Sequence, residues 1–221
     1  WSSFQQNLPL TPVTDIKIHR GDLVLSSMGR SFWILDNIST LSQMESLDWS
    51  KNKLYKPKNT YRYKYPSGAR ASSMPTYPRP AVIIDYTIAD SISEPIQLEI
   101  INSQGDVINT FFSNDDENEI PEETIENMST NQVEYIVDNS LSTHLGFNRY
   151  RWNMTESGPW HEDENRSYKG GPFAAPGRYI IRLTLDGQVY EQSLELLMDP
   201  RIEAYVSKED IQKQVTIHRQ I

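Results

Sequence analysis

The side chains best suited to chemistry in this chain are its histidines and acids. The four histidines are His19, His144, His161 and His218. His161-Glu162 begins like the His-Glu-x-x-His zinc motif, but Asn165 stands where the second histidine is needed. Glycoside hydrolysis needs two carboxylates about 5–10 Å apart, and with 30 acids such a pair is expected by chance. We therefore predict no catalytic residue, no metal site and no cofactor.

Other common catalytic motifs are also missing from the sequence. There is no cysteine, which excludes disulfides, thiolate zinc sites and cysteine nucleophiles. Neither a Gly-x-Ser-x-Gly elbow nor a phosphate-binding glycine loop occurs. Gly170-Gly171-Pro172 predicts a turn, because proline lacks the N–H group that a phosphate cradle would use. Arg20-Gly21-Asp22 is an adhesion-like triplet, but a β-turn explains it.

Aromatic side chains provide the best candidates for a binding site. Residues 53–80 hold seven Lys or Arg, five Tyr, five Pro and no acids. The favoured interpretation of this segment is a strap that runs extended over a sheet. Trp152 lies outside it and is favoured as a core aromatic residue, with Trp160 packing a long loop. The alternative is a basic, aromatic surface for a glycan or an anion. Tyr63 and Tyr65 are its candidate ligand-binding residues, and Trp160 and Tyr168 are the candidates of a separate sugar-stacking platform on a later loop.

Acidic residues outnumber basic ones, and the net charge is −9. This disfavours a nucleic-acid binder, because phosphate neutralisation needs clustered Lys and Arg. Seven acids lie within Asp115–Glu126, but their spacing does not match an EF-hand loop. The segment 114–145 is therefore predicted to begin as a solvated loop. No apolar run approaches 18 residues, so no transmembrane segment is predicted.

Short β-strands must position these residues. Residues 13–36 predict a three-stranded meander, which is too small to bury both of its faces and needs neighbours. Residues 38–49 have apolar positions spaced by three, which predicts a short amphipathic helix. Turns at 103–106 and at Asp186-Gly187 predict two later hairpins. The strands predicted after the strap are residues 81–88, 96–102, 107–113, 147–154, 177–185 and 189–198, a spacing typical of an Ig-like β-sandwich.

The last part of the sequence predicts a helix. Ser207 is its expected N-cap, and Glu209 and Asp210 favour the first turn. No Gly, Asn or Pro stop signal follows Gln214, so the helix is expected to have no end within the sequence. Since Trp1 is not preceded by an initiator Met or a signal-peptide pattern, the sequence is interpreted as a fragment of a longer polypeptide.

Two groups of motifs resemble a known family. Asp22-Leu23-Val24-Leu25 and above all residues 29–36, Gly-Arg-Ser-Phe-Trp-Ile-Leu-Asp, resemble the final blade of sortilin-like, sialidase-type (BNR repeat) β-propellers. These occur in large exported bacterial proteins that are often labelled glycosyl hydrolase. Met28 stands where the family usually has a histidine, and the Asp-box pattern is absent.

The later motifs are similar to the module that follows the propeller. They are residues 146–153 (Gly-Phe-Asn-Arg-Tyr-Arg-Trp-Asn), residues 171–179 with their Pro-Gly-x-Tyr turn, and Asp199-Pro200-Arg201. This module is similar to the Ig-like domain of flagellar hook-capping proteins, and helices follow it in the family.

The resemblance implies an all-β protein in four parts. These are a last-blade remnant (1–37), a connecting helix and basic strap (38–80), an Ig-like β-sandwich with an acidic insertion at 114–145 (81–200), and the start of a helical region (201–221). It implies an exported, non-catalytic accessory module that caps the propeller and binds the remainder of its own polypeptide, a partner protein or a glycan. The alternative is part of a glycoside hydrolase whose active site lies in other blades.

Overall fold

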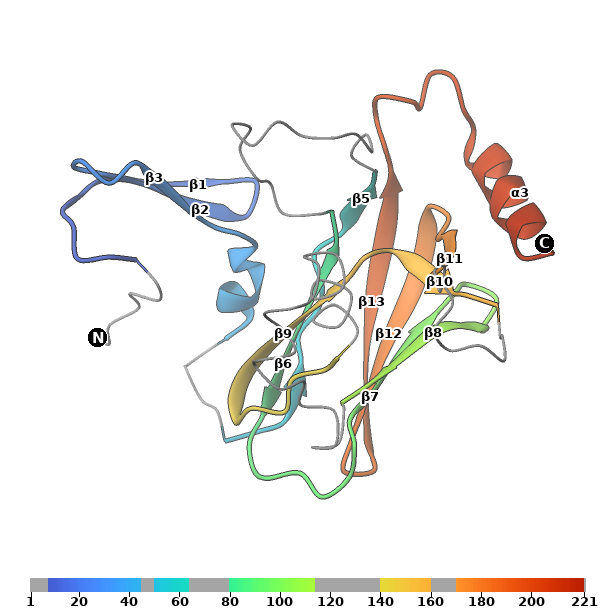
Figure 1. Ribbon diagram of the computed structural model, residues 1–221, viewed down its shortest axis with the longest axis horizontal. Helices are drawn as coiled ribbons and strands as arrows, with labels where there is room; N and C mark the ends of the chain where they lie inside the picture. The colour runs from blue at the N-terminus through green and yellow to red at the C-terminus, as the bar shows by residue number, and fades with distance from the viewer. Residues whose placement is uncertain (1–7, 45–49, 64–79, 114–139, 160–169, 221) are drawn as a thin grey trace, which may run out of the picture. The chain divides into compact units, whose positions relative to one another are not determined.

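The computed structural model describes residues 8–44, 50–63, 80–113, 140–159 and 170–220. These residues form mostly β-strands, which confirms the all-β prediction (Figure 1). The chain divides into two compact units, Trp1–Asp48 and Trp49–Ile221. Three of the predicted binding residues, Tyr65, Trp160 and Tyr168, and most of the acidic segment lie outside the described residues.

Unit 1 is an antiparallel meander followed by a short helix. Its strands are β1 (Val13–His19), β2 (Asp22–Ser27) and β3 (Phe32–Leu35), in the order β1-β2-β3. Arg20 and Gly21 both have positive φ, as the tight turn between β1 and β2 requires. The predicted amphipathic helix is a 3₁₀ helix, η1 (Ile38–Gln43), so its described part makes i→i+3 turns and not α-helical ones.

Both faces of the meander carry apolar side chains. Cross-strand partners point to the same face of a sheet, and the register therefore assigns each side chain to a face. The first face holds Ile16, Leu25 and Trp33 in one row, and Ile18, Leu23 and Leu35 in the next. The second face holds Val24 beside Ile34, and Ser26 beside Phe32.

Unit 2 contains three sheets. The largest has five strands in the order β5 (Thr60–Arg62), β13 (Gln188–Met198), β12 (Gly177–Leu185), β7 (Gln97–Ile101) and β8 (Val107–Phe112). The second has the order β4 (Lys53–Leu54), β6 (Val82–Ile88) and β9 (Gly146–Trp152). The third pairs β10 (Thr155–Ser157) with β11 (Gly170–Phe173).

One hydrophobic core draws on all three sheets. It includes Ile84 and Trp152 from the three-stranded sheet, Leu98 and Ile181 from the five-stranded sheet, and Met154 beside β10, each of them fully buried. The prediction that Trp152 is a core aromatic residue is confirmed. Both predicted hairpin turns are also present, with positive φ at Gly105, Asp186 and Gly187.

Helix α3 (Lys208–His218) follows β13 and packs through a separate core. Its predicted N-cap is confirmed, because Ser207 and Asp210 form a reciprocal capping box. The helix is assigned as far as His218, and Arg219 after it still has right-handed helical backbone angles. Beyond His218, the Arg219 N–H donates to the Val215 carbonyl and the Gln220 N–H donates to the Ile217 carbonyl.

The predicted turn at Gly170-Gly171-Pro172 is wrong, because these residues belong to strand β11. Gly171 serves a close approach between strands. A Cβ atom on Gly171 would lie 2.5 Å from the carbonyl oxygen of Glu156, and closer still to that of Ser157. Only glycine therefore lets β11 cross β10 at this distance. Pro172 is tolerated in β11 because a short two-stranded pairing has few ladder hydrogen bonds that a missing N–H group could break.

The predicted strap, residues 53–80, is only partly an extended loop in its described part. The segment after residue 52 contributes two short strands, β4 to the three-stranded sheet and β5 to the edge of the five-stranded sheet. Pro57 lies between them, where no ladder hydrogen bond is required. The prolines from Pro66 to Pro78 lie outside the described residues.

Candidate functional site

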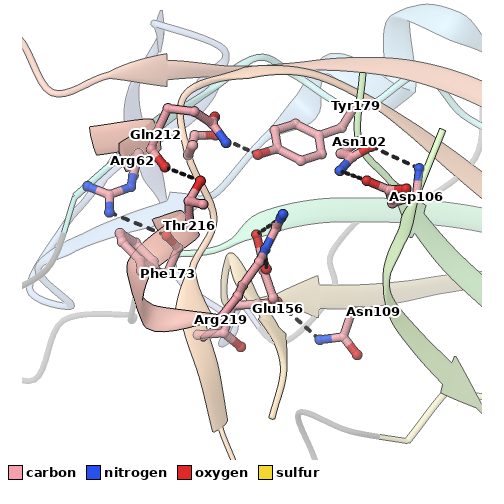
Figure 2. A network of polar contacts seen from close by, with 12 residues as sticks. Arg62, Asn102, Asp106, Asn109, Glu156, Phe173, Tyr179, Gln212, Thr216 and Arg219 are labelled. Carbon is pink, nitrogen blue, oxygen red and sulfur yellow. Dashed lines mark hydrogen bonds and ion pairs between the residues drawn. The ribbon is translucent and has the colours of Figure 1, made fainter. Parts of the chain in front are cut away.

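A network of polar contacts lies where β5, β10, β12 and the β7–β8 hairpin approach α3 (Figure 2). All of its residues belong to unit 2. Its central group is the carboxylate of Glu156, in the middle of the three-residue strand β10. Near it lie the side chains of Asn109, Tyr179 and Arg219, while Arg62 lies farther away beside Phe173 (Figure 2).

Strand β10 is held on both sides of Glu156. The Thr155 carbonyl accepts a hydrogen bond of 2.9 Å from the Trp152 indole and one of 3.0 Å from the Asn109 amide. The Ser157 hydroxyl donates to the Asn109 side-chain oxygen at 3.1 Å. These contacts join β10 to β8 and to the core aromatic residue of β9. The carboxylate of Glu156 is thus attached to a strand that is fixed at each neighbouring residue.

Glu156 and Arg219 form a bidentate ion pair. Arg219 Nε donates to Glu156 Oε2 at 2.6 Å, and Nη2 donates to Oε1 at 2.7 Å. The Glu156 side chain is only 7% exposed, whereas that of Arg219 is 36% exposed. The hydrogen bonds that Arg219 donates to Glu156 raise the pKa of Arg219, so its charge is permanent. Both carboxylate oxygens are occupied, and the pair joins β10 to the end of α3.

Tyr179 of β12 lies beside this ion pair. Its hydroxyl donates to the Ala175 carbonyl at 2.6 Å, and its ring meets Trp152 edge-on at 5.9 Å between centroids. Burial, with a smaller contribution from the charge of Glu156, raises the pKa of Tyr179 to about 12. The phenol is therefore neutral at physiological pH and acts as a hydrogen-bond donor, not as a base.

Arg62 of β5 fixes the segment that connects β11 to β12. Its Nε donates to the Ala174 carbonyl at 2.7 Å, and its guanidinium lies 4.5 Å from the centroid of the Phe173 ring. Burial lowers the pKa of Arg62, as expected for a cation whose described partners are neutral carbonyls and a ring. Arg62 thus holds the chain at the place where Ala175 meets α3.

A small hollow lies between the ion pair, the β7–β8 turn and the start of β12, and its volume is about 30 Å³. Ligand pockets usually measure about 300–1,000 Å³, so this hollow is too small for a typical small-molecule substrate. Partners within the protein are present for all four titratable groups of the network, which are Arg62, Glu156, Tyr179 and Arg219. The network can therefore hold α3 in place, but it presents no unpaired nucleophile or base for a reaction.

The structure describes one of the four predicted binding residues, Tyr63. Its ring lies 5.4 Å from the guanidinium carbon of Arg201. Two nitrogens of the Arg201 guanidinium donate hydrogen bonds to the carboxylate of Asp199. Tyr63 is half-buried and lies outside the Glu156 network. This contact favours a packing role for its ring.

Sequence reasoning missed the residues of the network itself. Glu156 and Arg219 are 63 positions apart, and no motif links them. A signal did exist on the helix, because Ile211, Val215 and Arg219 follow the N-cap at a spacing of four, which places them along one face. Nothing in the sequence distinguishes Glu156 from the other 29 acids.

Two further properties concern the described residues alone. Among them, no group of three or more His, Asp or Glu side chains is arranged to hold a metal ion. None of their helices is long and apolar enough to span a membrane.

Comparisons with known proteins found no matching family model, no matching curated protein and no matching solved structure.

Proposed function

We propose that this chain is a non-catalytic accessory module of a large exported β-propeller protein. In this proposal β1–β3 are strands of the final propeller blade, and unit 2 is an Ig-like sandwich of the flagellar hook-cap type that follows the propeller. The module would cap the propeller and hold the helical region that begins with α3. The observation that carries the proposal is the exposure of apolar side chains on both faces of the meander.

The exposed side chains are large and lie on opposite faces. On the first face, Ile16 is 60% exposed and Ile18 is 69% exposed. On the second face, Phe32 is 74% exposed and Ile34 is 63% exposed. Contiguous exposed apolar surface marks an interaction site, and a sheet that is apolar on both faces is typical of one packed between two neighbours. Blades of a β-propeller are packed in this way.

The size of each face favours neighbours from the same polypeptide. Three strands about 4.8 Å apart and up to seven residues long, with about 3.4 Å per residue, cover roughly 300 Å². A stable complex between separate proteins buries about 800 Å² on each partner. One face is therefore too small to hold a separate protein. A covalently linked neighbour needs less contact area, because the linkage raises its effective concentration.

Glycan recognition is a weaker part of the proposal. Tyr63 contacts Arg201, and Tyr65, Trp160 and Tyr168 lie outside the described residues. The contribution of these side chains to a glycan site thus stays a prediction from the sequence.

Hydrogen exchange tests the proposal. In the isolated chain of 221 residues, amides of β1–β3 should exchange at least a hundredfold faster than those of β12, because no neighbour covers the meander. In the native polypeptide that carries this sequence, protection should rise over β1–β3 and stay unchanged over β12, which serves as the internal control. Equal protection of β1–β3 and β12 in the isolated chain would contradict the proposal. So would an intact native mass of 25.6 kDa.

A further inference from the structure

Helix α3 contacts unit 2 through a single stripe. Ile211 is 3% exposed and Val215 is 1% exposed, and Arg219 reaches Glu156 from the next position at the same spacing. Residues four apart lie above one another on a helix. The stripe therefore consists of two apolar side chains, Ile211 and Val215, followed by Arg219. The other described residues of α3 are exposed.

The surface of unit 2 that receives α3, called the groove below, has side chains in a matching order, with apolar residues first and a charged residue at the end. Its apolar part consists of Ala175, in the middle of the β11–β12 connection, and Met198, at the end of β13, while Ile202 and Val206 of the segment that leads into α3 pack against the same cluster. The buried carboxylate of Glu156 forms its polar end. A planar guanidinium fits a carboxylate with two parallel hydrogen bonds, which a lysine cannot do. The groove is therefore specific for a helix that carries arginine at the third position of the stripe.

Docking of α3 is separable from the folding of unit 2. The apolar contacts of α3 belong to a cluster distinct from the main core. Burial of two aliphatic side chains contributes roughly 3–6 kcal/mol, part of which is offset by the ordering of the helix. A helix of 11 residues is marginal in water by itself. Release of α3 would thus leave the β-sheets and their core intact.

We propose that this groove is a helix-binding site that α3 fills as an exchangeable ligand, and that the α3 of a second copy of this chain can bind there in its place. The second copy is the occupant that the geometry supports, because its helix carries the same stripe of Ile211, Val215 and Arg219. Two chains would then exchange helices reciprocally, and each site would be completed by the other chain's arginine. All of these residues lie in unit 2, so the inference does not depend on the propeller proposal.

Complementary variants of the full chain test this exchange. Ile211→Asp spoils the helix but leaves the groove intact, whereas Glu156→Ala spoils the groove but leaves the helix intact. Mixed at micromolar concentrations, the two variants should form a 1:1 heterodimer in sedimentation velocity, while each variant alone stays monomeric. Gln214→Asp, which introduces the same residue at an exposed position of α3, is the matched control and should not form a heterodimer with Glu156→Ala. A monomeric mixture would overturn the exchange between copies.

A peptide of residues 205–221 tests the helix-binding site separately from the exchange of helices between two copies. It should bind the Ile211→Asp chain at least tenfold more tightly than the wild-type chain, where the tethered α3 competes at an effective concentration on the order of millimolar. The same peptide with Arg219→Ala should bind at least tenfold more weakly. Equal binding of the two peptides, or no binding of either, would overturn the helix-binding site itself. Unchanged hydrogen exchange over β12 would show that the Ile211→Asp chain is folded.

Discussion

Removal of the Arg219 side chain should loosen α3 without unfolding the sheets. In Arg219→Ala, the carboxylate of Glu156 loses both hydrogen bonds while its side chain remains almost fully buried. Breaking a buried ion pair costs about 3–5 kcal/mol. Because the Arg219 side chain is 36% exposed, water can reach the vacated place, and we expect about 2 kcal/mol. At about 1.4 kcal/mol per factor of ten, the opening equilibrium of α3 should rise roughly thirtyfold.

Native-state hydrogen exchange measures this opening directly. Amides of α3 should lose about thirtyfold in protection, whereas those of β12 should change by less than twofold. The double variant Glu156→Gln/Arg219→Ala should recover part of the loss, because the uncompensated charge is gone. Arg219→Lys should fall between the wild type and Arg219→Ala, since it keeps the charge but not the two-pronged geometry. A loss below threefold in Arg219→Ala, or an equal loss over β12, would refute the reasoning.

Two further predictions concern the strands beneath the network. Gly171→Ala should destabilise unit 2 by about 2 kcal/mol in urea unfolding, because its Cβ would meet the backbone of β10, while Gly170→Ala should be tolerated because a Cβ there meets no atom within 4 Å. Equal effects of the two substitutions would contradict the close approach. The pKa of Tyr179 is raised to about 12 from about 10 in the unfolded chain. The contribution of the neutral Tyr179 side chain to the free energy of unfolding is therefore complete below pH 10 and is lost as the pH rises to 12. Between pH 9 and pH 11 the free energy of unfolding should fall by about 1.4 kcal/mol more in the wild type than in Tyr179→Phe, and parallel curves would contradict this.

Local patterns predicted much of the β-structure. The hairpin at Asp186-Gly187 was identifiable because both residues must accept positive φ, which the pair does readily. Ser207 was identifiable as an N-cap because its bond to Asp210 spans three residues. These features depend on neighbours in the sequence, and propensity and spacing are sufficient to find them.

Features that depend on distant residues could not be predicted. Gly170-Gly171-Pro172 has the composition of a turn, but tertiary packing uses Gly171 for the approach of β11 to β10. The segment after residue 52 has the prolines of a loop, yet β5 pairs with a strand near the other end of unit 2. The ion pair of Glu156 and Arg219 arises in the same way, since each residue by itself has the chemistry of an ordinary surface charge.

The parallel pairing of β5 with β13 also determines the order in which unit 2 can be completed. The Glu195 N–H donates to the side chain of Asn59, 136 residues earlier, and Gln192 donates to the Leu54 carbonyl, 138 residues earlier. Contacts between such distant residues slow folding, because the entropy of closing the loop is lost before the contact forms. On the ribosome, β5 must therefore wait for β13 to emerge, whereas β4 can pair with β6 much earlier.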